Sequence, residues 1–391
     1  MITQTITTVL LLIVSTQFVL TFGQIFLTDY AQSNFTVNLL RKIAKNDKSA
    51  ILSPISISSV VFAVYLAADG ETKQQLKEIL GGAARGTEIE DHFARLLADF
   101  NRRENEDYTL NMANRFYVRQ EFSTKKSFAK ILEFYYCETL HKFNYEERNE
   151  LAQEVNNWVS EKTNNKIIEL MTGDNINEDT VMLLLNAIYF NGTWETQFND
   201  KKTHDEIFYV SENETKNVSM MAFEKRLPYY EDNFVKVVKL PYIGEEVEMI
   251  LILPKTSFGL RNVLENISGE DLLFYIDKAE QKLVSLKLPK FRLEADLNLK
   301  EILQEIGIVN AFSRAADFRK LTDQAISVSD IVHKSFIEVN EKGTESAAAT
   351  AVYLENLAYW EPEAFFIADQ PFLFAIVKDR KTILFAGQFA K

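Results

Sequence analysis

Near the C-terminus, residues 341–351 read Glu341-Lys342-Gly343-Thr344-Glu345-Ser346-Ala347-Ala348-Ala349-Thr350-Ala351. The segment follows a strand-like run, and from 352 to 363 the chain continues without a helical or core pattern. Strand-like sequence resumes after it, so we expect a loop that is held at both ends. A long unpatterned segment inside a compact domain is usually functional or disordered.

At a period of two residues, this segment has two different faces. One face carries no charge and changes from small to apolar; it consists of Thr344, Ser346, Ala348, Thr350, Val352 and Leu354. The other face carries the carboxylates Glu345 and Glu355. Such alternation is typical of a strand with one buried face, yet alanine is a weak strand former. We therefore expect a segment that can become a strand without being one; the alternative is an alanine-rich surface linker.

Composition indicates one large globular domain over residues 24–391. The chain has 391 residues, of which 47% are hydrophobic, and its 7 prolines and 13 glycines form no linker-like stretch. A net charge of −13 with scattered basic pairs argues against nucleic acid, anionic membranes and heparin-like polyanions as partners. The single cysteine, Cys137, allows no internal disulfide. We expect it to be partly buried; the alternative is a reactive or intermolecular thiol.

The first 23 residues predict a secretory signal peptide. They contain no charged residue and hold the apolar run Val9–Val14, with a plausible cleavage point after Gly23. A basic residue near Met1 is missing, so an uncleaved signal anchor is the alternative. Five glycosylation sequons also favour a secreted, extracellular glycoprotein, at Asn34, Asn191, Asn213, Asn217 and Asn266.

The order of elements predicts an α+β protein. Helices are expected mainly in the first half, at 35–43, 55–67, 71–80, 88–100 and 151–163, and one later at 299–306. Strands are expected at 181–190, 206–210, 234–240, 247–253, 282–288, 372–377 and 382–389. The run 181–190 is apolar throughout, which favours a central strand covered on both faces.

No enzyme motif stands out. The chain has no nucleophile elbow, phosphate-binding loop, dinucleotide fingerprint or zinc-protease motif, and one cysteine excludes a thiolate metal cluster. We therefore predict no metal, no cofactor and no enzymatic activity; a hydrolase remains an alternative because triad members need not be adjacent. Three histidines, His92, His141 and His204, are expected at the surface, and His333 is expected to be buried and hydrogen-bonded.

Two C-terminal segments resemble the serpins. Residues 336–350 resemble the serpin reactive-loop hinge, and residues 366–376 resemble the family signature that follows the loop. The likeness covers nearly the whole mature chain, and its order and spacing are specific although each motif alone is weak. The other matching segments are 34–35, 52–57, 157–167, 186–194, 288–291 and 316–318. Asn165 and Ser346 stand where the family commonly has glycine and alanine.

The resemblance implies three β-sheets, eight or nine helices and an exposed reactive-centre loop at about 343–364. It also implies suicide inhibition: a serine protease cleaves the loop and is trapped in a covalent complex as the loop enters the main sheet. Serpin loop insertion is an established case of strand addition and released strain. We expect a monomer whose partner is the target protease. The alternatives are a non-inhibitory carrier or chaperone and a cross-class inhibitor of cysteine proteases.

The resemblance also assigns residues to roles. The hinge comprises Gly343, Thr344, Glu345, Ser346, Ala347, Ala348, Ala349 and Thr350. The polar shutter comprises Ser53, Ser56, Asn186 and His333, and Trp194 marks the breach where the loop enters. Family spacing places the scissile bond at Leu357-Ala358, although Leu354, Tyr359 or Trp360 would also suit an apolar pocket. No Arg or Lys lies between Gly343 and Ala368. A chymotrypsin-like or elastase-like target is therefore favoured over a trypsin-like one.

Overall fold

A computed structural model describes residues 27–44, 48–101, 107–344 and 361–391. The predicted signal peptide, the hinge residues 345–350 and the bond Leu357-Ala358 lie outside these ranges. Within them, no helix has both the length and the apolar character needed to cross a membrane. The same ranges contain no group of three or more His, Cys, Asp or Glu side chains that could hold a metal ion.

Nine helices occur in the described residues. They are a helix over 27–43, α2 (Pro54–Ala67), α3 (Gly70–Gly81), α4 (Gly86–Phe100), α5 (Lys126–Tyr136), α6 (Arg148–Lys162), α7 (Leu260–Asn266), α8 (Gly269–Asp277) and α9 (Leu299–Glu305). As expected, Ser53 is the N-cap of α2 and Pro54 fills its first turn, where a missing N–H is harmless. Every residue of α2 is buried, which makes it the central helix of the fold.

The strands form two hydrogen-bonded sheets in the described part of the chain. The smaller sheet has the order β10 (Phe291–Asn298), β11 (Asp330–Asn340), β12 (Gly343–Thr344), β4 (Met182–Thr193), β2 (Tyr108–Arg119) and β3 (Leu140–Phe143). The larger has the order β1 (Ala50–Leu52), β15 (Thr382–Phe389), β14 (Phe372–Lys378), β8 (Val247–Pro254), β7 (Val235–Pro241), β6 (Glu214–Glu231), β9 (Glu280–Pro289) and β13 (Ala364–Ile367), with β5 (His204–Ser211) also on β6.

The α+β class is confirmed. The strands form two sheets where three were expected, and the long strand β6 explains the difference. Its 18 residues pair with β5 near the start, with β9 in the middle and with β7 at the end. One continuous strand thus joins two parts of the architecture that would otherwise count as separate sheets.

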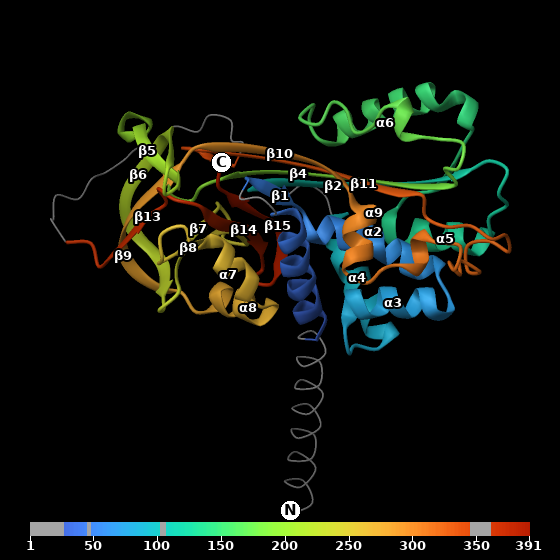
Figure 1. The fold of residues 1–391 in the computed structure, drawn as a ribbon, viewed down its shortest axis with the longest axis horizontal. Helices are drawn as coiled ribbons and strands as arrows, with labels where there is room; N and C mark the ends of the chain where they lie inside the picture. The colour runs from blue at the N-terminus through green and yellow to red at the C-terminus, as the bar shows by residue number, and fades with distance from the viewer. Residues whose placement is uncertain (1–26, 45–47, 102–106, 345–360) are drawn as a thin grey trace, which may run out of the picture.

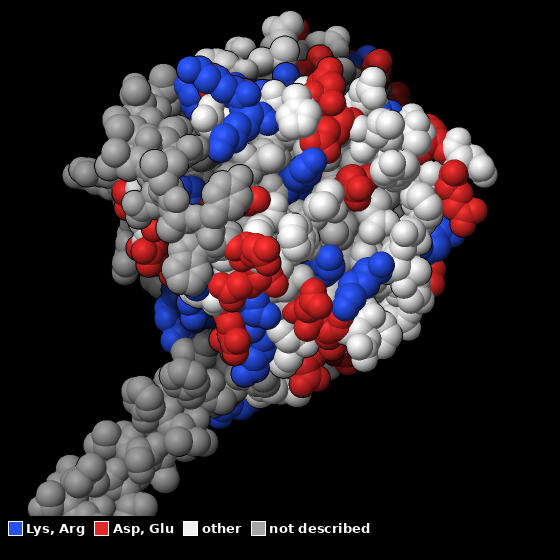
Figure 2. Space-filling model, turned by 90° about the vertical axis from the view of Figure 1, so that its left-hand side faces the viewer, with Lys and Arg blue, Asp and Glu red and all other residues white. Residues whose placement is uncertain are grey.

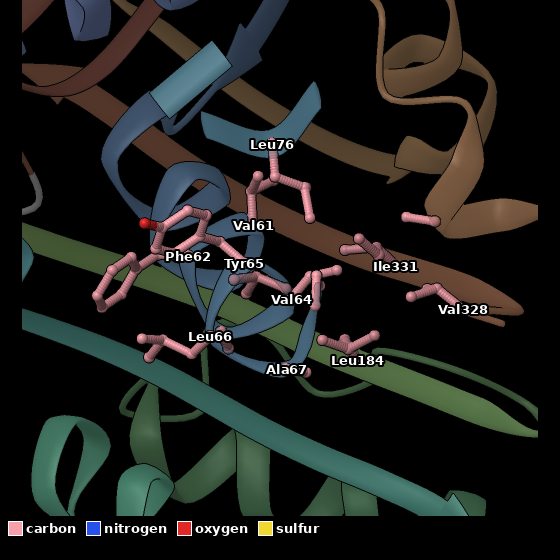
Figure 3. Close-up of a cluster of buried hydrophobic side chains, with 14 of the residues drawn as sticks. Val61, Phe62, Val64, Tyr65, Leu66, Ala67, Leu76, Leu184, Val328 and Ile331 are labelled. Atoms are coloured by element: carbon pink, nitrogen blue, oxygen red, sulfur yellow. The ribbon is translucent and has the colours of Figure 1, made fainter. Parts of the chain in front are cut away.

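The six-stranded sheet is covered on both faces, as predicted for β4. Figure 1 shows α6 alone above one face and the α2 to α5 group below the other. Successive side chains of β4 pack on opposite faces of the sheet. Leu184 packs in the cluster around α2, together with Val64 and Ile331 (Figure 3). Leu185 packs in the cluster around α6, together with Val159. Burial on both faces makes parting this strand from a neighbour a large rearrangement.

Three expectations are corrected. The helical first half also contains a long strand that was not expected, β2, whose asparagines and arginines interrupt the apolar pattern that marks a strand. Cys137 is exposed and not partly buried, since it ends α5 in a left-handed conformation at the surface. His92 is mostly enclosed and not at the surface; it stacks edge-on with Phe93, and burial lowers its pKa to about 4.

Candidate functional site: an opening in the six-stranded sheet

The neighbouring strands β11 and β4 are paired at one end and parted at the other. They run parallel and in register from Asp330 opposite Leu183 to Ser335 opposite Ile188. Beyond that point they diverge, and the two-residue strand β12 lies between them, hydrogen-bonded to both. The first two hinge residues therefore already occupy the start of a strand position within the sheet.

Gly343 is required by the closeness of the strands at this point. A Cβ built on it would lie 2.0 Å from the carbonyl oxygen of Gly192 and 2.8 Å from the Cα of Thr193. These are backbone atoms in a paired strand and cannot move aside cheaply. Only glycine lets the chain pass from β11 into the gap without pushing β4 away.

Thr344 is fully buried and is fixed by an aromatic cluster at the parted end. Its hydroxyl lies 2.6 Å from the phenol oxygen of Tyr242, whose ring stacks on Trp194 with a centroid separation of 4.4 Å. The indole N–H of Trp194 donates to the carbonyl of Asn340 at 3.0 Å, and its backbone N–H donates to Lys342 at 2.9 Å. Trp194 is thus bonded to the end of β11 at the parted end; its assignment to the breach stays a prediction.

Tyr242 was missed by sequence reasoning although it contacts the hinge directly. Its complete burial raises the pKa of the phenol far above the ordinary value, so the hydroxyl stays protonated and can hydrogen-bond Thr344. A tyrosine after Leu240-Pro241 at a strand end carries no pattern that links it to a hinge one hundred residues away.

An ion pair ties Glu341, the residue after β11, to Lys290, which links β9 to β10. A carboxylate oxygen of Glu341 lies 2.9 Å from the ammonium of Lys290, and its carbonyl accepts from the backbone N–H of Phe198 at 2.9 Å. Partial burial raises the pKa of Glu341, but the hydrogen bond and charge of Lys290, together with further hydrogen bonds to the carboxylate, keep the pKa below its usual range. The hinge therefore leaves the sheet from a fixed point.

At the paired end, the four residues assigned to the shutter are in direct contact. Their hydrogen bonds run from Ser56 Oγ to Asn186 Oδ1 (2.8 Å), from His333 Nδ1 to Asn186 Oδ1 (2.5 Å), from the Ser53 N–H to His333 Nε2 (3.2 Å) and from Ser53 Oγ to the Leu384 carbonyl (2.6 Å). All four residues are fully buried. The expectation that His333 is buried and hydrogen-bonded is confirmed.

The network spans the joint between the strands. His333 on β11 pairs directly with Asn186 on β4, and Asn186 pairs with Asn114 on β2, so the three share one row across the sheet. Asn186 Nδ2 donates to Asn114 Oδ1 at 2.6 Å, a partner that sequence reasoning missed. Any strand that enters between β11 and β4 at this depth must break the bond between His333 and Asn186.

His333 works in this network only as a neutral ring. Complete burial lowers its pKa to about 3. With Nδ1–H donating to Asn186, Nε2 is left to accept from the Ser53 N–H. A second proton on Nε2 would point at that N–H and abolish the bond.

The sequons differ in exposure. Asn213 and Asn217 on the β5–β6 hairpin and Asn266 at the end of α7 are exposed, whereas Asn191 on β4 is half-buried. Asn34 is half-buried in the helix over 27–43, and its Oδ1 accepts from the Gly269 N–H at 3.1 Å. A glycan on Asn34 would have to compete with this hydrogen bond.

Comparison with known proteins identifies the family. A family model described as serpin (serine protease inhibitor) matches residues 30–391. The chain is 35% identical to Serpin B6 of Pongo abelii over 373 residues, covering 92% of this chain and 98% of that protein. It superimposes on Serpin48 of the insect Tenebrio molitor with a TM-score of 0.83 and 30% identity, covering 93% and 98% of the two chains.

A further solved structure shows that the fold alone does not determine the function. The complex of thyroxine-binding globulin with thyroxine matches with a TM-score of 0.82 over 93% of this chain and 98% of that one, at 24% identity. The same architecture therefore also serves a protein that binds a small hormone, and inhibition must be argued from the hinge and the sheet. The family match, the relatives and the sheet geometry together establish that this chain belongs to the serpin family, whose members are mostly protease inhibitors rather than enzymes.

Proposed function

We propose that this serpin is secreted and inhibits serine proteases by a suicide mechanism. The observation that carries the proposal is the position of β12: Gly343 and Thr344 lie between the parted ends of β11 and β4 and hydrogen-bond to both. In sequence, Ser346, Ala348 and Thr350 follow on the same period-two face as Thr344. Small uncharged residues are what a strand needs to continue along that gap.

The mechanism follows from loop closure. An intact loop is attached at β12 and again at β13, so it cannot extend along the gap. Cleavage frees the upstream part, about ten residues of which can gain ladder hydrogen bonds at roughly 0.5–1.5 kcal/mol each, together with burial of the inward face. A protease still esterified to the new C-terminus would be dragged along the sheet and distorted.

Insertion depends on the balance between the hydrogen bonds that are lost between β11 and β4 and those that the inserted strand gains. The β11–β4 pairs from Asp330 to Ser335 and the His333–Asn186 bond must break before the new strand can form. These bonds hold the sheet closed before cleavage, and equivalent ladder bonds to the inserted strand replace them afterwards. The gain exceeds the loss because one new strand makes two ladders where only one existed.

We further propose a chymotrypsin-like or elastase-like target, with Leu357-Ala358 as the scissile bond. Leucine fits an apolar specificity pocket, and a trypsin-like pocket would find no basic residue between Gly343 and Ala368. The inhibitor is proposed to act as a monomer, without a cofactor.

The proposal is tested by incubating the purified protein with chymotrypsin and with elastase and running denaturing gels. We expect an SDS-stable complex and a released fragment whose sequence begins at Ala358. Clean cleavage without a complex would refute inhibition. Papain in parallel tests the cross-class alternative, which predicts a complex with papain instead. A thermal shift with small apolar ligands and no complex with any protease would favour a carrier.

A further inference from the structure

The hairpin of β5 and β6 turns two large apolar side chains toward solvent. Exposure alternates along β5: Ile207 is 51% exposed and Tyr209 is 45% exposed, whereas Phe208 between them is fully buried against Phe389. Ile207 and Tyr209 therefore stand together on the face of the hairpin that points away from the core. Large apolar side chains side by side on an exposed strand invite association unless something covers them.

The strand register places a glycosylation sequon on the same face. Ile207 pairs with Asn217 on β6, and Tyr209 pairs with Thr215. Residues directly opposite each other share a face, with their Cβ atoms about 5 Å apart, and the diagonal neighbour is about 7–8 Å away. Asn217 is exposed. A sugar attached to its side chain thus begins beside Ile207 and lies within reach of the ring of Tyr209.

The other exposed sequons lie in different surroundings. Asn213 is in the turn between β5 and β6, so a glycan there would project from the tip of the hairpin. Asn266 ends α7, and its amide Nδ2 donates to the carbonyl of Asn262 at 2.8 Å. Asn217 is the exposed sequon whose place in a strand ladder sets it directly across from an exposed apolar side chain.

The hydroxyl of this sequon is already engaged in the folded chain. Ser219 Oγ donates to Asp205 Oδ1 at 3.0 Å across the hairpin. Carbohydrate must therefore be attached before β5 and β6 pair, while residues 217–219 are extended and free. In that step the anomeric carbon of the sugar exchanges its bond to the diphosphate of a lipid-linked donor for a bond to Asn217 Nδ2. The proton lost by the amide is taken up by the released diphosphate.

Charge does not favour a charged macromolecule on this face. The carboxylate of Asp205 is hydrogen-bonded to Ser219, and the rows of Ile207 and Tyr209 hold uncharged partners. Figure 2, which looks onto the end of the molecule that holds β5, β6, β9 and β13, shows acidic and basic side chains interspersed and no field of one sign. A neutral, amphipathic occupant fits, because the negative face of an aromatic ring attracts the partly positive C–H groups of a sugar.

We propose that Asn217 carries an N-linked glycan whose first sugar packs on Ile207 and Tyr209 and covers this face of the hairpin. The glycan then forms part of the packing and is more than a solubilising group. Without it, the two side chains are left as an exposed apolar pair and the chain associates more readily. The inference rests on the secretion included in the proposed function and is independent of inhibition.

The test uses the full chain secreted by eukaryotic cells that make high-mannose glycans. Peptide mass spectrometry first measures which sequons are occupied, and we expect Asn217 to be modified in most secreted molecules. Native protein is then trimmed by endoglycosidase H, which leaves the first sugar, or stripped by peptide N-glycosidase, and the nitration of Tyr209 is measured. Stripping should raise nitration about twofold, because the sugar covers one of the two faces of the ring, whereas trimming should not raise it.

The variant Asn217→Gln should raise the nitration of Tyr209 to the level of the stripped protein. Asn213→Gln, which removes an exposed sequon four residues away, is the matched control and should not. Because trimming and stripping need no substitution, a folding defect in Asn217→Gln does not decide the result.

An unoccupied Asn217 in secreted protein, or equal nitration of trimmed and stripped protein, would overturn the glycan packing and leave secretion standing. A glycosylated chain that elutes as a dimer, and as a monomer in Ile207→Thr/Tyr209→Thr, would assign the face to a second copy of this chain instead. Retention of the chain inside the cell with no sequon occupied would refute secretion, and this inference with it.

Discussion

The two ends of the joint between β11 and β4 are held by different kinds of side chain, aromatic at the parted end and polar at the paired end. At the parted end, Thr344 is buried at the stacked pair of Trp194 and Tyr242 and hydrogen-bonds to the Tyr242 hydroxyl, so stacking and hydrogen bonds act together. At the paired end, Asn186 and His333 hold the strands by directional hydrogen bonds in a fully buried row. Stacked rings can accept a small side chain between strands, whereas a hydrogen-bonded row is either made or broken. The sheet therefore holds the first hinge residues at one end and resists opening at the other.

The largest expected effect on inhibition comes from a substitution that prevents residue 344 from being buried at the parted end. Thr344→Arg places a charge where the side chain has no exposure and leaves the Tyr242 hydroxyl without its partner. We expect the variant to be cleaved as a substrate, with a stoichiometry of inhibition raised at least about tenfold, since insertion competes with deacylation.

The control for this substitution is Glu345→Arg. Residue 345 falls on the other face of the period-two pattern, so this change should leave the stoichiometry near the wild-type value. Unchanged inhibition by Thr344→Arg would show that Thr344 need not be buried in the sheet.

The next effect comes from weakening the paired end. Asn186→Ala removes the acceptor of His333 Nδ1 and Ser56 Oγ and the donor to Asn114. Each buried group left without a partner costs about 1–3 kcal/mol, so we expect a loss of roughly 3 kcal/mol or more in unfolding free energy. The joint should also open more readily, which native-state hydrogen exchange of β11 amides would detect.

Asn191→Ala, a half-buried position on the same strand, is the matched control and should change stability by much less. Equal losses for the two variants would mean that the buried row has no special part in closing the sheet.

A smaller effect is expected from pH. The folded pKa of His333 (about 3) lies below its unfolded value of about 6.5, so the unfolded state binds more protons between these values and stability falls as pH falls. The slope is up to about 1.4 kcal/mol per pH unit for this one group. His92, with a folded pKa of about 4, acts in the same direction.

The measurement is chemical denaturation between pH 6.5 and pH 5, above the range of most carboxylates. His333→Gln should flatten the slope even if it lowers stability overall. His204→Gln, which changes a histidine with a 62% exposed side chain, should not. An identical slope in wild type and His333→Gln would contradict a neutral His333.

The smallest effect concerns the ion pair at the end of β11. Glu341→Gln removes its charge opposite Lys290 while keeping the size of the side chain. Because Lys290 is partly exposed, we expect a loss of about 1 kcal/mol or less. Thermal unfolding at low and high salt measures it, and a loss well above that value would show that the pair controls the parted end.

Sequence reasoning was most successful where the pattern was local. The apolar run of β4, the N-cap and proline that start α2 and the two final strands each follow from a few neighbouring residues. The hinge, predicted from its small residues and from family resemblance, stays a prediction, because only Gly343 and Thr344 of it are described. Tyr242 and Asn114 were missed because each acquires its part only through a partner on a distant strand. His92 and Cys137 were misplaced because burial depends on which helix face meets the core, and the polar residues of β2 concealed a strand.

The central claim is that the cleaved hinge becomes a new strand between β11 and β4. The most direct measurement is the thermal unfolding midpoint before and after a protease that is not trapped cuts the loop within 351–360. Insertion on the order of 10 kcal/mol predicts a rise of more than about 10 °C in the wild type and little rise in Thr344→Arg. An unchanged or lower midpoint after cleavage of the wild type would contradict insertion.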